Sequence, residues 1–339
     1  MKNYIEKLLS KENLTIEESY DAMNRIMSGS VDNSNLAGLL IALKAKGEAA
    51  SEVAGFAKAM RDNCIKINVP LENTIDVCGT GGDGSGTFNI STAVSFVVAG
   101  AGIKVAKHGN RSISSKSGSA DVLQQLGINI NLTKEQSEEA LDKVGMSFLF
   151  APLYHPAMKY AGQVRKELGI KTVFNMLGPL TNPAGVKRQL IGTFSIKAAE
   201  TMCEATKYLD QEKVCFVCSN DKFDEIHLGE ETSVFEFNGK ENLPVYKISN
   251  DTFGFPKTIF DEIKGDSAEK NAEIILDVLD KKKKNSAYYV TVANAAMGLY
   301  SAGHSDDLKK CASTAEESIA NGSAYSKLME LKNFSSKYV

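Results

Sequence analysis

The sequence has no tryptophan, only seven prolines and four histidines among 339 residues, and no long apolar run. Its most apolar stretch, residues 94–105, is interrupted by glycines and by Lys104, and it falls well short of the ~18 residues of a membrane span. The first twenty residues interleave charged and apolar side chains, so they lack the apolar centre of a signal peptide. These absences predict a soluble, cytoplasmic protein with no membrane partner.

Cysteine is also scarce, since six residues are too few for a disulfide framework in a chain of this length. The closest pair, Cys215 and Cys218, has no further Cys or His at zinc-ligand spacing and lies in a run typical of a buried strand. We therefore interpret the pair as core packing. The formal net charge of −3 gives no electrostatic reason to expect nucleic acid as a partner, so any anion site must be local.

The hydrophobic pattern divides the chain near Pro70. Residues 1–64 show helical periodicity with a capping box that starts at Thr15, and helices are expected over residues 36–46 and 48–62. Further along we expect strands over residues 74–77, 103–106 and 146–150, and helices over residues 89–101, 119–126, 133–144, 154–168 and much of 285–331. The alternation predicts an α/β fold, with a mostly parallel sheet flanked by helices and a smaller all-helical domain before it.

The strongest local signal is a glycine-rich segment between an expected strand and an expected helix. Five of the eight residues from 79 to 86 are glycine. Glycine lets the backbone approach a ligand closely, and free amides at a helix start favour an anion, so the segment predicts a phosphate-binding loop rather than a simple turn. The G-x-G-x-x-G pattern of dinucleotide sites is also satisfied, but no acidic residue follows about 20 positions later.

A second cluster, residues 107–119, follows the next expected strand. It holds four cationic or potentially cationic side chains, five serines and two glycines in thirteen residues. Such a density of donors predicts an anion-binding surface, although a surface loop can also be basic by chance. Because parallel strands end at the same edge of a sheet, we expect this cluster to face the glycine loop.

These two segments, GTGGD leading into TFNIST and KHGNRS leading into SGSADVL, resemble the anthranilate phosphoribosyltransferase family, a branch of the nucleoside-phosphorylase-like phosphoribosyltransferases. The resemblance continues through residues 148–158, 164–169, 174–180 and 294–296, and so covers nearly the whole chain. It implies transfer of the phosphoribosyl group of 5-phosphoribosyl-1-diphosphate (PRPP) to the amine of anthranilate in tryptophan biosynthesis, with Mg²⁺ as cofactor at two ions per subunit.

The resemblance also implies an organisation and a set of contacts. A small helical domain, residues 1–70 plus about 155–190, is hinged to a large α/β domain, residues 71–154 plus about 191–339, and a homodimer forms through the helical domain. The implied PRPP contacts are Gly79, Gly82, Asp83, Thr87, Asn89, Ile90, Ser91, Thr92, Lys107, His108, Gly109, Asn110, Arg111, Ser112, Ile113, Ser114, Ser115 and Ser119. The implied anthranilate contacts are Gly79, His108, Asn110, Arg165 and Gly178, and the implied catalytic residues are Lys107, His108 and Arg165.

Asp224 and Glu225 form an adjacent acidic pair after an expected strand. Mg²⁺ takes one or two carboxylates together with substrate phosphate oxygens, and the resemblance implies that this pair, with Ser91, holds the metal; taken alone it would be a solvated acidic pair. The surrounding loop departs from the family pattern, which has His-Gly, then Gly-Leu, then a small hydroxyl residue, where this chain has Cys218-Ser219, Lys222-Phe223 and His227. These departures leave the acidic pair in place but make the shape of the loop and its affinity for the metal differ from the family pattern.

Two alternatives remain open. A pyrimidine nucleoside phosphorylase shares a related glycine loop but not the KHGN motif of residues 107–110. A non-catalytic, nucleic-acid-binding relative would be strongly basic or lack the acidic pair. The run of lysines at residues 281–284 is interpreted as a solvated helix end or loop, because nothing basic or aromatic extends it.

Overall fold

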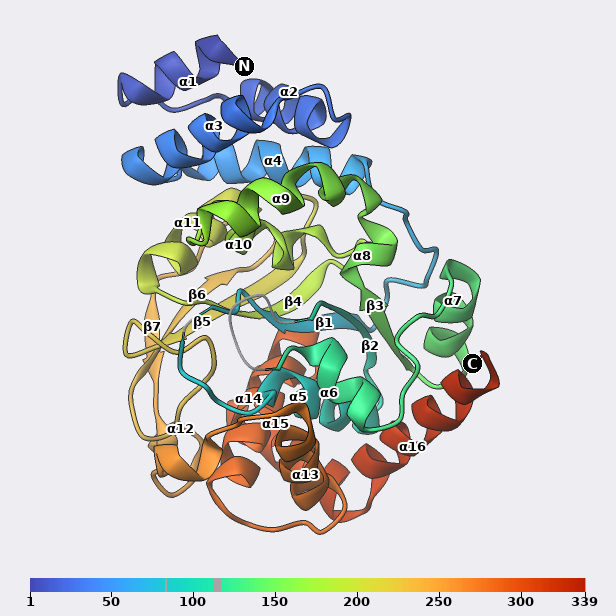
Figure 1. Ribbon diagram of the computed structural model, residues 1–339. Helices are drawn as coiled ribbons and strands as arrows, with labels where there is room; N and C mark the ends of the chain where they lie inside the picture. The colour runs from blue at the N-terminus through green and yellow to red at the C-terminus, as the bar shows by residue number, and fades with distance from the viewer. Residues whose placement is uncertain (83, 112–116, 339) are drawn as a thin grey trace.

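The computed structural model describes residues 1–82, 84–111 and 117–338 and is built on one sheet of seven strands (Figure 1). The strand order is β3-β2-β1-β4-β5-β6-β7. The strands are β1 Thr74–Gly79, β2 Lys104–Gly109, β3 Met146–Phe150, β4 Arg188–Gly192, β5 Lys213–Ser219, β6 Thr232–Phe237 and β7 Tyr246–Ile248. Strands β1 to β5 pair in parallel, while β6 and β7 are antiparallel. The predicted fold class, a mostly parallel sheet flanked by helices, is confirmed.

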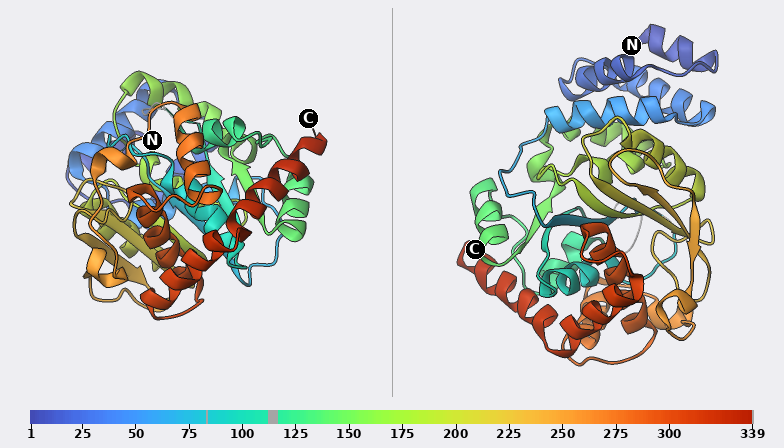
Figure 2. Two further views of the ribbon diagram at one scale, coloured as in Figure 1. Left: turned by 90° about the horizontal axis from the view of Figure 1, so that it is seen from below. Right: turned by 180° about the vertical axis from the view of Figure 1, so that it is seen from behind.

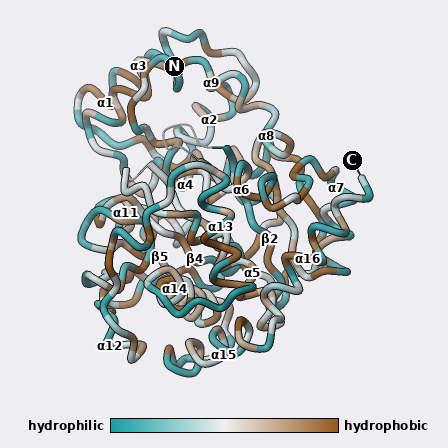
Figure 3. The backbone as a smooth tube through the Cα atoms, turned by 60° about the horizontal axis from the view of Figure 1, so that its bottom comes forward, coloured by the Kyte–Doolittle hydropathy of each residue, from teal (hydrophilic) through white to brown (hydrophobic). Residues whose placement is uncertain are grey.

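Alternate residues of the central strands point to opposite faces, and each face is covered by helices. On one face Val77 and Leu190 share a core with helices α5 (Ile90–Gly100) and α14 (Ser286–Ala302). On the other face Ile191 and Phe216 share a core with helices α4 (Ala50–Asp62) and α11 (Ile196–Thr206). The helices of the first face are α5 Ile90–Gly100, α6 Ser119–Gln125, α13 Ala268–Leu279, α14 Ser286–Ala302, α15 Leu308–Ala320 and α16 Ser323–Ser335. Figure 3 shows the hydrophobic colour gathered in α5 and the central strands.

The N-terminal helices pack on the second face together with a segment from the middle of the chain (Figures 1 and 2). These helices are α1 Lys2–Leu9, α2 Ile16–Met27, α3 Asn33–Lys46, α4 Ala50–Asp62, α9 Lys159–Leu168, α10 Phe174–Leu177 and α11 Ile196–Thr206. The predicted capping box is present, since Glu18 N–H donates to Thr15 Oγ1 and Thr15 N–H donates to Glu18 Oε2. Within the described residues, no helix combines the length and the apolar character needed to cross a membrane.

One predicted helix, residues 154–168, is wrong as a single element. The chain instead forms α8 Ala151–Tyr154, a short 3-10 turn η1 Pro156–Met158, and then α9. His155, with φ −121° and ψ 60°, leaves the helical region because the ring of Pro156 restricts the residue before it. The remaining elements are α7 Lys134–Lys143, α12 Asn250–Phe253, η2 Pro179–Thr181, η3 Phe260–Ile263 and η4 Ser336–Tyr338.

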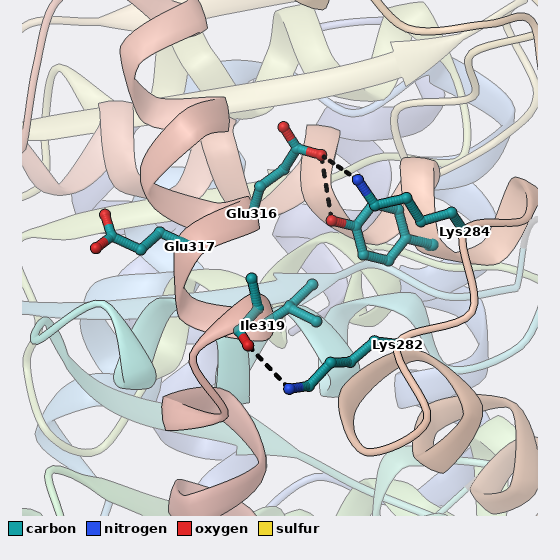
Figure 4. Close-up of a pocket in the computed structure, with 7 residues that line it drawn as sticks. Lys282, Lys284, Glu316, Glu317 and Ile319 are labelled. Atoms are coloured by element: carbon teal, nitrogen blue, oxygen red, sulfur yellow. Dashed lines mark hydrogen bonds and ion pairs between the residues drawn. The ribbon is translucent and has the colours of Figure 1, made fainter.

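The four lysines at residues 281–284 are held by acceptors of the chain itself. Lys281 and Lys283 both contact Asp277, at 2.8 and 2.6 Å. Lys282 donates to the carbonyl of Ala320 at 2.8 Å, and Lys284 lies 3.9 Å from Glu316. Figure 4 shows Lys282, Lys284 and Glu316 around the cavity that they line. The run follows α13, which ends at Leu279, so it lies in the loop between α13 and α14, in agreement with the interpretation as a solvated helix end or loop.

Candidate active site

The glycine loop and the acidic pair meet at the edge of the sheet where the parallel strands end. Asp224 Oδ2 accepts a hydrogen bond from the Gly81 N–H at 2.8 Å. Glu225 Oε1 accepts one from the Thr87 hydroxyl at 3.1 Å. Segments 138 to 143 residues apart in the sequence are thus in direct contact, and both carboxylates face the glycine loop.

Glycine is required where the loops approach most closely. A Cβ on Gly79 would lie 2.7 Å from Asp224 Oδ2, and one on Gly192, at the end of β4, would overlap the carbonyl oxygen of Asp224. Gly81 and Gly82 have φ of 62° and 72°, in the left-handed region that other residues rarely adopt. The loop therefore bends, and receives Asp224, only because these positions carry no side chain.

Lys107 points into the sheet from β2. Its side chain is buried, and Nζ donates to the Val77 carbonyl at 2.7 Å and to Ser91 Oγ at 3.1 Å, so the ammonium lies at the first turn of α5. Burial lowers the pKa of Lys107, and the carboxylate of Asp76 opposes that shift. Asp76, in turn, is fully buried and accepts a hydrogen bond from His108 N–H at 3.2 Å.

Asp76 is a residue whose importance the sequence analysis missed. Burial raises its pKa, and the positive charge of Lys107 is the largest influence that opposes the rise. The sequence could have indicated this, because Asp76 is a carboxylate in the middle of an expected buried strand, where a charged group needs a partner. The Lys107 ammonium, bonded to the Val77 carbonyl and to Ser91, lies beneath the glycine loop, where an anion would bind.

Two neighbouring histidines are neutral at pH 7. Burial lowers the pKa of His108 to about 3 and that of His155 to about 4. His108 Nδ1 lies 3.3 Å from the carbonyl oxygen of Gly178, His155 Nε2 lies 3.0 Å from that of Thr181, and the ring centroids are 5.2 Å apart. Because a carbonyl only accepts, each of these nitrogens carries the proton. His108 Nε2 is thus an acceptor, buried and without a partner among the described residues.

The two histidines should make the protein less stable in mild acid. Each has a folded-state pKa below the unfolded value of about 6.5, so the unfolded chain binds more protons and stability falls as the pH falls below 6.5. Between pH 7 and pH 5 we expect a loss of about 2 kcal/mol for each histidine. Urea unfolding at the two pH values measures it. His155→Gln, which can still donate to Thr181, should lose less stability over this interval, whereas replacing the exposed His304 should leave the loss unchanged.

Arg165 lies on α9 with its guanidinium carbon 5.0 Å from the centre of the Phe174 ring. Partial burial lowers its pKa, yet the guanidinium has no ion pair or hydrogen bond within the part of the chain that is described. A cation that is partly desolvated and lacks a carboxylate partner is suited to bind one from a ligand. Gly178, at the end of α10, contacts His108 through its carbonyl.

The other expected PRPP contacts lie around the start of α5 and α6. Ser119 Oγ donates to the carbonyl of Asn110 at 3.3 Å, and Arg111 binds Asp121 at 2.6 Å on α6. Gly82, Asn89, Thr92 and Gly109 lie in the same two segments, while the side chain of Ile90 is in the hydrophobic core, which leaves only its backbone for a ligand. Asp83, Ser112, Ile113, Ser114 and Ser115 lie outside the described residues.

Comparison with known proteins agrees with this architecture. Residues 71–325 match the glycosyl transferase family, a/b domain, and residues 2–64 match the helical bundle domain of the same family. The fold and the site therefore define a glycosyl transferase made of a helical bundle and an α/β domain.

Individual relatives narrow the family further. The chain is 46% identical to anthranilate phosphoribosyltransferase of Thermoanaerobacter sp. (strain X514), over 97% of each chain. The crystal structure of anthranilate phosphoribosyltransferase from Thermus thermophilus matches with a TM-score of 0.91 and 37% identity over 98% of each chain. The Saccharomyces cerevisiae enzyme in complex with PRPP and Mg matches with a TM-score of 0.91 and 27% identity, over 99% of this chain and 98% of that one. This chain belongs to the anthranilate phosphoribosyltransferase family, and the predicted resemblance is confirmed.

Proposed function

We infer that the protein transfers the 5-phosphoribosyl group of PRPP to the amine of anthranilate, giving N-(5-phosphoribosyl)anthranilate and diphosphate in tryptophan biosynthesis. The observation that carries this function is the contact between the glycine loop and the Asp224–Glu225 pair, in a chain 46% identical to an anthranilate phosphoribosyltransferase. That contact brings a phosphate-binding backbone and two hard oxygen ligands to one place.

The site fits Mg²⁺. Within the described residues no three acidic, His or Cys side chains converge as a complete metal site, so the chain offers a pair of carboxylates and leaves the other positions to water and substrate oxygens. We propose that Asp224 and Glu225, with the Ser91 hydroxyl, hold two ions per subunit. When bound, Mg²⁺ stabilises the negative charge of the departing diphosphate.

The residues of the chain contribute charge and position. We propose displacement at the anomeric carbon with inversion, through an oxocarbenium-like transition state and without a covalent intermediate. Lys107, held under the glycine loop, stabilises the developing charge on diphosphate, and orientation and charge stabilisation each supply several kcal/mol. The amine of anthranilate is neutral at pH 7, and His108 Nε2 orients it by accepting a hydrogen bond. A pKa of about 3 makes that nitrogen too weak a base to take the proton before the bond forms.

Arg165 is proposed to bind the anthranilate carboxylate. Replacing it with alanine should raise the KM for anthranilate by at least ~10-fold, since a hydrogen bond between charged groups contributes about 1.5–3 kcal/mol, and should leave the KM for PRPP nearly unchanged. Steady-state kinetics with each substrate varied in turn measure both values. Lys166→Ala, which removes an exposed cation from the same helix, is the control. An equal effect of Arg165→Ala on both KM values would contradict this role.

We also propose a division into two domains and a homodimer. Helices α1 to α4 pack with α9 and α10, which supports a small domain of residues 1–70 plus about 155–190 and a large domain made of the rest. Leu9 is 66% exposed and Ile41 43% exposed on this helical unit, which supports a homodimer formed through it. The cytoplasm remains the proposed location.

A fluorescence assay tests the function directly. With PRPP and Mg²⁺ present, the fluorescence of anthranilate should fall as it is consumed, and no fall should occur without Mg²⁺. Cleavage of thymidine by phosphate, with no use of anthranilate, would instead support a nucleoside phosphorylase. Neither reaction, together with salt-dependent binding of single-stranded DNA, would support a nucleic-acid-binding relative.

A further inference from the structure

The acidic pair lies in an irregular connection between two antiparallel strands. We call residues 220–231, between β5 and β6, the acidic loop. Its ends are fixed by the pairing of Ser219 with Thr232 in the ladder. Immediately after Ser219 the chain turns through Asn220 and Asp221, with φ of 51° and 49°. Asn and Asp adopt this left-handed conformation more readily than other residues with a side chain, so the sequence allows the turn, and contacts further along hold the rest of the loop.

The hydroxyl of Ser219 supplies three of these contacts. Its side chain is fully buried, and Oγ donates to the carbonyl of Glu225 at 2.5 Å and accepts from His227 N–H at 3.0 Å. Oγ also lies 2.6 Å from Thr232 Oγ1. Because a hydroxyl has one hydrogen and two lone pairs, and the carbonyl can only accept, Thr232 must be the donor in that last contact. Every hydrogen-bonding position of the Ser219 oxygen is therefore used.

Asn294, from helix α14, holds the residue between these two anchor points. Its Oδ1 accepts from Ile226 N–H and its Nδ2 donates to the Ile226 carbonyl, both at 3.0 Å. Two buried side chains, Ser219 and Asn294, thus bind the backbone of three consecutive residues, 225 to 227. On the other side of the loop the carboxylates of Asp224 and Glu225 contact the glycine loop. Ser219 and Asn294 thus fix the backbone of residues 225–227 on one side of the loop, while the two carboxylates face the substrate site on the other.

We propose that Ser219 is a positioning residue for Mg²⁺ binding. Its buried hydroxyl fixes the backbone of the acidic loop so that both carboxylates face the glycine loop. This inference rests on the proposed role of Asp224 and Glu225 as metal ligands. Ser219 stands at a position where the sequence departs from the family pattern. The contacts show how this chain shapes the loop there: without the hydroxyl, the Glu225 carbonyl and the His227 N–H would lose their buried partner.

The test measures metal binding as well as turnover. Mn²⁺ alone is titrated into the protein, and the free ion is followed by electron paramagnetic resonance. Ser219→Ala should weaken Mn²⁺ binding by about 10-fold, which is the effect typical of removing a group that orients a metal ligand. The Mg²⁺ concentration for half-maximal rate should rise by a similar factor, while the KM for anthranilate stays within about twofold of wild type.

Matched variants separate this role from a general loss of packing. Ser301→Ala removes another fully buried serine hydroxyl, which donates to Met297 within α14, and should bind Mn²⁺ like wild type. Thr232→Val keeps the shape of the threonine but removes its donor to Ser219, and should weaken Mn²⁺ binding in the same direction by a smaller factor. If Ser219→Ala does not fold, Mn²⁺ binding by Thr232→Val tests the positioning role in its place.

The outcomes also distinguish the positioning role of Ser219 from the proposed role of Asp224 and Glu225 as metal ligands. Wild-type Mn²⁺ affinity in Ser219→Ala and Thr232→Val, with loss of binding when Asp224 and Glu225 are replaced by their amides, overturns the positioning role alone. Wild-type affinity in the amide variant overturns the metal assignment and the positioning role together. Equal weakening by Ser301→Ala and Ser219→Ala also overturns the positioning role, because any lost buried hydroxyl would then suffice.

Discussion

Replacing Asp224 with asparagine and Glu225 with glutamine should reduce turnover by about a thousand-fold or more. The amides keep the size of the side chains and can still accept hydrogen bonds from Gly81 N–H and the Thr87 hydroxyl, so the loop should remain in place. What they lose is the negative charge that holds Mg²⁺ against the diphosphate, and with it several kcal/mol of charge stabilisation in the transition state. Initial rates over a range of Mg²⁺ concentrations measure the loss.

A surface variant in the same connection is the control for this change. Glu231→Gln removes an exposed carboxylate that pairs with Lys247 at 2.7 Å, and it should keep the wild-type rate within about twofold. Near-normal rates in the amide variant at ordinary Mg²⁺ concentrations would contradict the assignment of the two residues as metal ligands.

Replacing Lys107 with methionine should impair both turnover and folding. Methionine fills a similar volume but removes the charge beside Ser91, and we expect turnover to fall by about 100-fold. It also removes the positive charge that most favours the ionised form of the buried Asp76 carboxylate, so we expect a loss of roughly 1–3 kcal/mol of stability. Urea unfolding and steady-state kinetics measure the two effects separately.

The loss of stability in this variant should depend on pH. Without Lys107, burial raises the pKa of Asp76 further, opposed only by hydrogen bonds from groups such as Asn182 and the His108 N–H, so the folded variant keeps a proton at pH values where the unfolded chain has lost it. Stability of this kind is present at low pH and is lost as the pH rises. The difference between wild type and variant should therefore be smaller at pH 5 than at pH 8. Lys104→Met, on the same strand but partly exposed, should change stability by less than about 0.5 kcal/mol at either pH. A loss of stability that does not change with pH would contradict the electrostatic influence of Lys107 on Asp76.

Features encoded by neighbouring residues could be predicted from the sequence. The capping box at Thr15, the glycine-rich bend after β1 and the alternation of strands and helices all depend on residues a few positions apart, where backbone preferences and side-chain spacing decide the structure. The substrate contacts came from motif resemblance, and the fold class and family were confirmed. The sequence analysis did not predict the helix break at His155, because it followed the helical periodicity of residues 154–168 and did not use Pro156 as a helix boundary.

Properties that depend on burial and on distant contacts were decided only by the tertiary structure. Three properties have no local signature: the neutral state of His108, the electrostatic influence of Lys107 on Asp76, and the hydrogen bonds from Ser219 and Asn294 to the acidic loop. Each arises where separate segments of the chain exclude water together. The sequence by itself determined which chemical groups are present and which local shapes carry them. Packing across the sheet decided which of those groups meet, because the free energy of a buried charge or hydrogen bond depends on its partners in space.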